Sequence, residues 1–143
     1  MATKKQEYLD ILLPLTKKYI EANSTNNGYE KSNLHFEISK ILCEYAVGKE
    51  NMGEYYSGLK LHIHKITTDV TERLEDIGVP ITRGYIPATI LPESLQRHAT
   101  KLALKLMERI DADSTDGYIQ LINNDINVHK LKTPTKRLIG VNI

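Results

Sequence analysis

The spacing of apolar residues through the middle of the chain is the feature that most restricts its fold. Apolar side chains recur there at steps of four, three, four, four and three residues: Leu59, Ile63, Ile66, Val70, Leu74 and Ile77. These steps match one face of an α-helix continued for about five turns. The sequence therefore predicts a helix in this region and a mainly α-helical protein around it.

The first part of the same segment also permits an extended interpretation. The stretch LKLHIHK, residues 59–65, alternates apolar and polar residues as a half-buried strand does. A strand would place His62 and His64 on one face as two candidate metal ligands, whereas a helix would set them about 200° apart. Ile66 breaks the alternation, so the helix is favoured, and the β-branched residues after it allow a break near Lys65.

Two helices are expected before this segment. The first covers residues 5–22, where Pro14 starts either a kink or a new helix. Turn-forming residues then fill positions 23–33 and predict an exposed loop. The second helix covers residues 34–47 and ends at Gly48.

The clearest apolar stripe of the chain belongs to a helix expected at residues 92–110. Pro92 suits its first turn. The stripe consists of Leu95, Ala99, Leu102, Leu106 and Ile110, widened by Ala103 and Met107. It is wider than one small domain requires, so we expect a second copy of the chain to cover it in a homo-oligomer. Cover by the N-terminal helix of the same chain is the alternative.

The C-terminal residues permit two interpretations. Two strands at 118–123 and 126–132 could be joined by a turn at Asn124 and Asp125. A short helix over residues 118–126 fits nearly as well. The sequence leaves both open.

Composition favours a globular, intracellular protein. Hydrophobic residues make up 41% of the 143 residues, charged residues 26%, and the formal net charge is +1. This balance argues against a protein that holds nucleic acid by bulk charge alone. The lone Cys43 fits a reducing compartment, the start of the chain lacks a signal peptide, and no apolar run approaches the ~18 residues of a membrane span.

No catalytic or cofactor-binding motif stands out. The chain has no glycine-rich phosphate loop and no HExxH, and the acidic turn at residues 111–117 fits no register of a calcium-binding EF-hand loop. Cys43 lies beside the inward stripe of its helix, which indicates a structural thiol rather than a nucleophile. We therefore expect a protein that is not an enzyme and that binds no cofactor and no metal.

The stretch LEDIGVPITRGYIPA, residues 74–88, resembles the end of the recognition helix and the wing of winged helix-turn-helix proteins from phage and mobile-element regulators. The similarity extends over residues 34–110, about half the chain. It implies a mainly α fold with a small β-hairpin near residues 80–86. The winged helix-turn-helix core would carry an extra N-terminal helix and loop at 1–33 and a C-terminal extension at 111–143.

The resemblance implies a small DNA-binding regulator or packaging-type adaptor in the host cytoplasm or in a virion, with a recognition helix at 66–77. Binding to double-stranded DNA would be weak and dominated by phosphates, because the outward residues of that helix are largely acidic. The implied DNA contacts are Lys60, Lys65, Thr68, Arg73, Arg83, Lys130, Lys132, Lys136 and Arg137. The alternative is a non-enzymatic protein-interaction module, either a virion component or an inhibitor of a host system.

Overall fold

The part of the chain that the structure describes is helical. The computed structural model describes residues 3–52, 57–80, 89–113, 117–121 and 123, and no strand occurs among them. Its elements are α1 (Lys4–Ser24), α2 (Gly28–Val47), the 3-10 turn η1 (Lys49–Asn51), α3 (Ser57–Thr71), the 3-10 turn η2 (Leu74–Ile77) and α4 (Pro92–Asp111). Residues 117–121 are also helical. The expectation of a mainly α protein is confirmed for this part of the chain.

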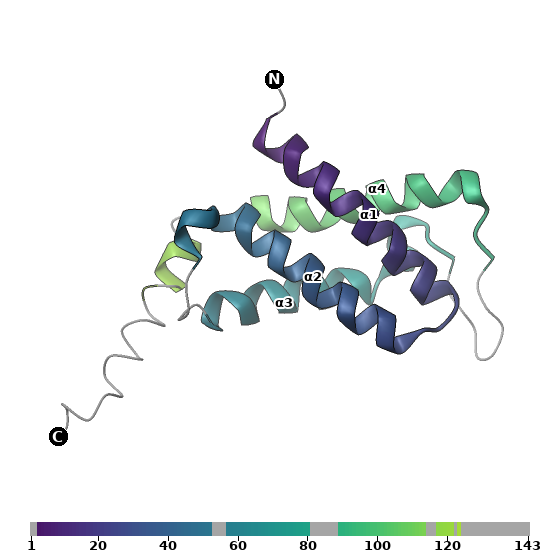
Figure 1. Cartoon of the computed structure of the whole chain (residues 1–143), viewed down its shortest axis with the longest axis horizontal. Coiled ribbons are helices and arrows are strands. Elements are labelled where there is room, and N and C mark those ends of the chain that lie inside the picture. Colours follow the sequence, from purple (N-terminus) through teal and green to yellow (C-terminus); the bar gives the residue numbers. More distant parts are fainter. Residues whose placement is uncertain (1–2, 53–56, 81–88, 114–116, 122, 124–143) are drawn as a thin grey trace.

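The four α-helices pack as an antiparallel bundle. Consecutive helices run in alternating directions, each packs on the next, and α4 packs back on α1 (Figure 1). Every helix buries apolar side chains between the four axes, including Leu12, Ile38, Ile63 and Leu106, which are all fully buried. This shared core follows from the amphipathic pattern of each helix.

The first helix continues through its proline. Thr3 caps α1 by accepting a hydrogen bond from the Gln6 backbone N–H, and no second helix begins at Pro14. The buried Thr16 hydroxyl donates to the Ala99 carbonyl of α4 at 3.0 Å. A buried polar side chain therefore ties α1 to α4.

The second helix begins earlier than the sequence indicated. Asn27 is its N-cap, and the Asn27 side chain accepts a hydrogen bond from the Glu30 backbone N–H at 3.1 Å. The loop predicted for residues 23–33 is therefore wrong over 28–33, because exposed polar residues fit the first turns of a capped helix as well as they fit a loop. The expected division of the chain between residues 33 and 34 falls inside α2. Its predicted end at Gly48 is confirmed.

The middle segment is helical from its start, so the strand interpretation of residues 59–65 is wrong. Leu59, Ile63, Ile66 and Val70 are all buried, as the helical spacing predicted. A single recognition helix over 66–77 is also wrong, because α3 ends at Thr71 and only η2 follows. The Thr71 hydroxyl donates to the Thr67 carbonyl at 2.8 Å, and such a bond competes with the helical ladder.

The predicted wing hairpin lies outside the described residues, since residues 81–88 are not described. At the C-terminal end, the helical segment 117–121 contradicts a strand beginning at residue 118 and agrees with the short-helix alternative there. The remaining residues of either interpretation, 124–132, are not described.

The apolar stripe of α4 is covered within the chain. Ala99, Leu102, Ala103, Leu106 and Met107 are fully buried, and α1 and α3 pack against the helix that carries them. The second copy that was expected to cover this stripe is therefore not needed for that purpose. None of the described helices is long and apolar enough to span a membrane.

Candidate functional site

The predicted DNA-binding residues that the structure describes point in different directions. Lys60 lines a depression together with residues of α2. Arg73 follows the end of α3, and its guanidinium approaches the Asp69 carboxylate at 3.4 Å. Asp69 also accepts a hydrogen bond from Arg109 of α4 at 2.6 Å. Lys65 is exposed on α3. These residues therefore make different contacts within the protein, and their role as DNA contacts stays a prediction.

The other predicted contacts add little to that picture. The Thr68 hydroxyl is hydrogen-bonded to His35 Nε2 of α2 at 3.0 Å, so it serves the contact between two helices. The remaining five residues lie outside the described part of the chain: Arg83, Lys130, Lys132, Lys136 and Arg137.

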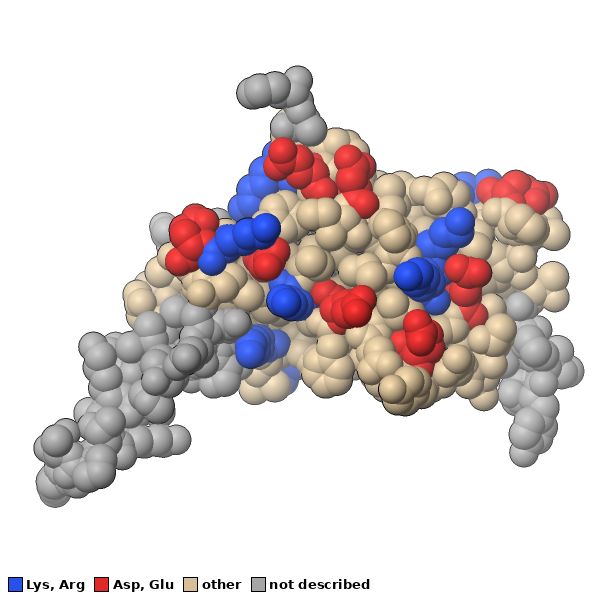
Figure 2. Space-filling model, viewed as in Figure 1, with Lys and Arg blue, Asp and Glu red and all other residues tan. Residues whose placement is uncertain are grey.

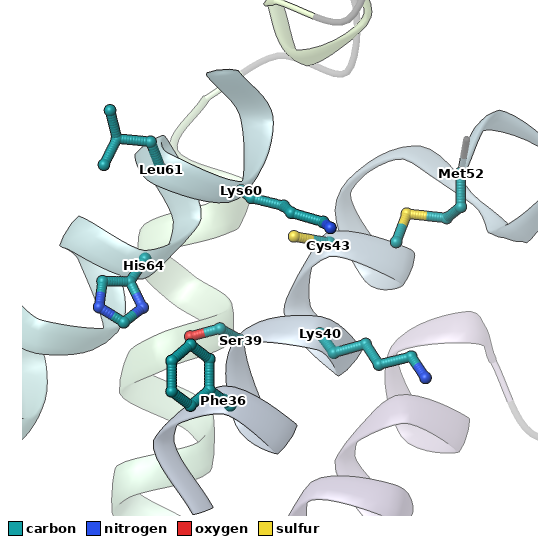
Figure 3. A pocket seen from close by; sticks show the side chains of 8 residues that line it. All are labelled: Phe36, Ser39, Lys40, Cys43, Met52, Lys60, Leu61 and His64. Carbon is teal, nitrogen blue, oxygen red and sulfur yellow. The ribbon is translucent and has the colours of Figure 1, made fainter. Parts of the chain in front are cut away.

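A concave surface lies between α2 and α3, and Lys60 is one of its lining residues. One depression of about 740 Å³ is lined by Phe36, Ser39, Lys40 and Cys43 of α2, by Met52, and by Lys60, Leu61 and His64 of α3 (Figure 3). Lys60 extends from α3 across the gap toward Cys43. Ser39 and Cys43 are buried at the floor, whereas Phe36 and Leu61 are 67% and 57% exposed.

A second depression continues the first along the same two helices. It has a volume of about 510 Å³, shares Phe36 and His64 with the first, and reaches Lys31 near the start of α2. The two depressions together are called the α2–α3 groove below. The second is lined by Tyr19, Gly28, Lys31, Ser32, His35, Phe36, His64 and Thr68.

The α2–α3 groove is one-sided in charge. Among the described residues that line it, three are lysines and two are histidines, and none is Asp or Glu. Over the described part of the face drawn in Figure 2, basic and acidic side chains are interspersed. The groove is therefore a local positive region in a chain whose net charge is only +1.

Two histidines pack against each other beside this groove. The rings of His35 and His64 lie edge to face with centroids 4.2 Å apart. Burial, with a smaller contribution from His64, lowers the pKa of His35 to about 4, so His35 is neutral at pH 7. His62 points elsewhere and meets the Asp113 carboxylate at 3.2 Å. The two histidines of the HIH stretch are thus separated, as a helix requires.

The groove has no activated nucleophile. Burial raises the pKa of the Cys43 thiol to about 11, so it stays protonated near neutral pH. No group of three or more His, Cys, Asp or Glu side chains suited to a metal ion occurs among the described residues. The groove offers a buried floor formed by Ser39 and Cys43, two exposed apolar side chains and a basic rim.

Sequence reasoning missed the two exposed apolar residues of this groove, Phe36 and Leu61, although a signal was present. Phe36 and Leu61 each lie off the inward stripe of their helix, between residues that are buried: Leu34 and Ile38, or Leu59 and Ile63. A large apolar residue on the outward face of an amphipathic helix has no place in the core, which makes it a candidate for binding.

The chain was compared with family models, curated proteins and solved structures, and none matches it significantly.

Proposed function

We propose that this protein is a non-enzymatic protein-interaction module and that the α2–α3 groove is its binding surface. The observation that carries this proposal is the exposure of Phe36 and Leu61 over one groove. Burying such side chains against a partner contributes about 25 cal/mol per Å² of apolar surface removed from water. Protein interfaces commonly combine an apolar, aromatic centre with a polar rim, and Lys40 and Lys60 supply such a rim.

The proposed lack of catalysis and the proposed setting come from the sequence. We propose a role without catalysis, cofactor or metal. The raised pKa of the Cys43 thiol argues against this residue as a nucleophile. A virion component or an inhibitor of a host system in the cytoplasm is the setting that the resemblance to phage proteins favours.

A second candidate function is weak binding to double-stranded DNA by a winged-helix regulator or packaging-type adaptor. The positive lining of the groove favours this candidate, and Lys65 is a further exposed lysine of α3. Fluorescence anisotropy with mixed-sequence duplex tests it, because phosphate-dominated binding weakens steeply as salt rises. Salt-sensitive binding that is lost in Lys60→Glu and Lys65→Glu supports it, and no binding at low salt removes it.

Site-specific photocrosslinking tests the main proposal. A photoreactive phenylalanine analogue replaces Leu61 in the groove, and in a matched variant it replaces Leu104, which is 39% exposed on α4. Irradiation in cells native to the protein is expected to give a discrete protein adduct from position 61 and none from position 104. A nucleic-acid adduct at position 61, or equal protein adducts from both positions, contradicts the proposal.

A further inference from the structure

We infer that the occupant of the α2–α3 groove is an acidic amphipathic α-helix of a partner protein. This inference rests on the proposed function and adds the chemistry of the partner. It is carried by the shape of the groove, its apolar lining and its charge.

The shape of the groove suits a helix. The groove follows two antiparallel helices from the neighbourhood of Gly28 to that of Cys43. At 1.5 Å per residue these two positions are about 22 Å apart along α2, so a bound helix of roughly 15 residues would extend over the groove. Amphipathic helices bind in this way, with apolar residues at spacings of three and four in the groove.

The lining of the groove specifies apolar anchors. Phe36 and Leu61 stand on opposite helices, and Met52 and the buried Cys43 also line the groove. Aromatic and Met side chains are enriched at the centres of interfaces, where they exclude water around a few strongly bound anchors. An apolar lining of this kind favours a peptide over the phosphates of a nucleic acid.

The charge of the groove specifies acidic residues beside those anchors. Lys31, Lys40 and Lys60 lie along the groove from one end to the other, and none of its described lining residues is acidic. Carboxylates on the flanks of a bound helix would meet these lysines, and a basic helix would be repelled.

The chain's own C-terminal segment does not have this chemistry. Residues 124–143 contain four basic residues, Lys130, Lys132, Lys136 and Arg137, and one acidic residue, Asp125. Since the groove is itself positive, a segment with this composition is the wrong occupant on electrostatic grounds. A separate acidic partner is the better match.

The test is a selection from a displayed library of random helix-forming peptides of about 16 residues, the length that the groove accommodates. Wild-type protein is the bait, and the Lys40→Glu/Lys60→Glu variant is used for counter-selection. Enriched peptides are expected to be net acidic, with apolar residues three or four positions apart. Enrichment of basic or unpatterned peptides, or no enrichment, overturns the inference.

Binding constants for the best peptide then locate its site. Phe36→Ala, Leu61→Ala and Lys40→Glu/Lys60→Glu are each expected to weaken binding at least about tenfold. The matched controls are Ile11→Ala and Lys17→Glu/Lys18→Glu, which alter exposed residues of α1. These should change binding less than about twofold, because they remove similar side chains away from the groove. Equal losses in groove and control variants overturn the inference.

The two experiments separate the inference from the proposed function. If position 61 crosslinks to a protein but the crosslinked segment is basic or not helical, the function holds and the acidic-helix inference fails. If the crosslinked partner is a second copy of this chain, the inference also fails. If position 61 yields no protein adduct and the selection is empty, both fail.

Discussion

The α1–α4 interface and the α2–α3 groove use similar residues in opposite ways. Along α4 the apolar residues Leu102 and Leu106 are fully buried, and Thr16 of α1 satisfies its hydroxyl on the α4 backbone. Beside the groove, Phe36 and Leu61 are mostly exposed. The first region forms part of the core that holds the fold together. In the second, Phe36 and Leu61 lie outside that core, and this difference is what makes the groove a candidate binding surface.

The largest effect is expected from a charge placed inside the α1–α4 interface. Leu102→Glu should abolish cooperative unfolding, because an unpaired buried carboxylate costs about 3–5 kcal/mol or more, close to the whole stability of a small domain. Circular dichroism during urea unfolding measures this. Leu104→Glu is the control, since Leu104 is 39% exposed on the same helix and should tolerate the change. A folded, monomeric Leu102→Glu protein would show instead that this stripe is an oligomer interface.

The next largest effect is a dependence of stability on pH, caused by His35 between α2 and α3. The pKa of His35 is lowered from 6.5 to about 4 in the folded protein. Between these two pKa values the unfolded chain protonates this histidine and the folded protein does not. The contribution of neutral His35 to stability is therefore fully present above pH 6.5 and is lost as the pH falls toward 4. We expect a loss of about 1–2 kcal/mol between pH 7 and pH 5, allowing for solvent screening. His35→Gln should flatten this slope relative to wild type, and an unchanged slope argues against a buried neutral imidazole.

Smaller effects are expected from the polar contacts that tie each helix pair. Thr16→Val removes the hydrogen bond to Ala99, and Thr67→Val removes the one that Thr67 accepts from Ser39 at 3.0 Å. Each should reduce the free energy of unfolding by about 1 kcal/mol, the usual net value of one hydrogen bond. Thermal unfolding of the two variants would show comparable decreases in Tm. A much larger decrease in Tm for Thr67→Val would contradict this expectation. It would mean that the packing of α2 on α3 depends strongly on this one hydrogen bond.

The smallest effect on stability is expected from the exposed side chains of the groove. Phe36→Ala and Leu61→Ala should change the free energy of unfolding by less than about 0.5 kcal/mol, as exposed positions usually do. Ile38→Ala, at a fully buried position of α2, should cost about 2–5 kcal/mol. Urea unfolding of the three variants decides whether Phe36 is retained for binding or for folding, because a core-like loss at Phe36 would assign it to folding.

The helices were predictable from the sequence because each buries a periodic apolar stripe. The spacing of Leu59, Ile63, Ile66 and Val70 is enough to reject a strand, and Pro92 marks the start of α4. The ends of the helices were harder to foresee, because local hydrogen bonds decide them. Asn27 is the N-cap of α2, seven residues before its expected start. Near the end of α3 the Thr71 hydroxyl donates to the Thr67 carbonyl.

The candidate site was not predictable in the same way. Lys60 and Arg73 are both basic residues of one sequence segment, but Lys60 of α3 lines the groove, whereas Arg73 follows α3 and pairs with Asp69. Which basic residues converge depends on how the helices pack, and the pattern of one helix contains no information about its neighbour's rotation. The outward positions of Phe36 and Leu61 were visible in the sequence, but their meeting over one groove was not.

Methyl NMR of the protein titrated with the partner recovered by crosslinking at position 61 tests the central claim most directly. The account predicts that the methyl signals of Met52 and Leu61 shift as partner is added, while those of Ile11 and Leu104, which are exposed on α1 and α4, stay in place. Shifts confined to Ile11 and Leu104, or no shifts at saturating partner, would contradict the assignment of the α2–α3 groove as the binding surface.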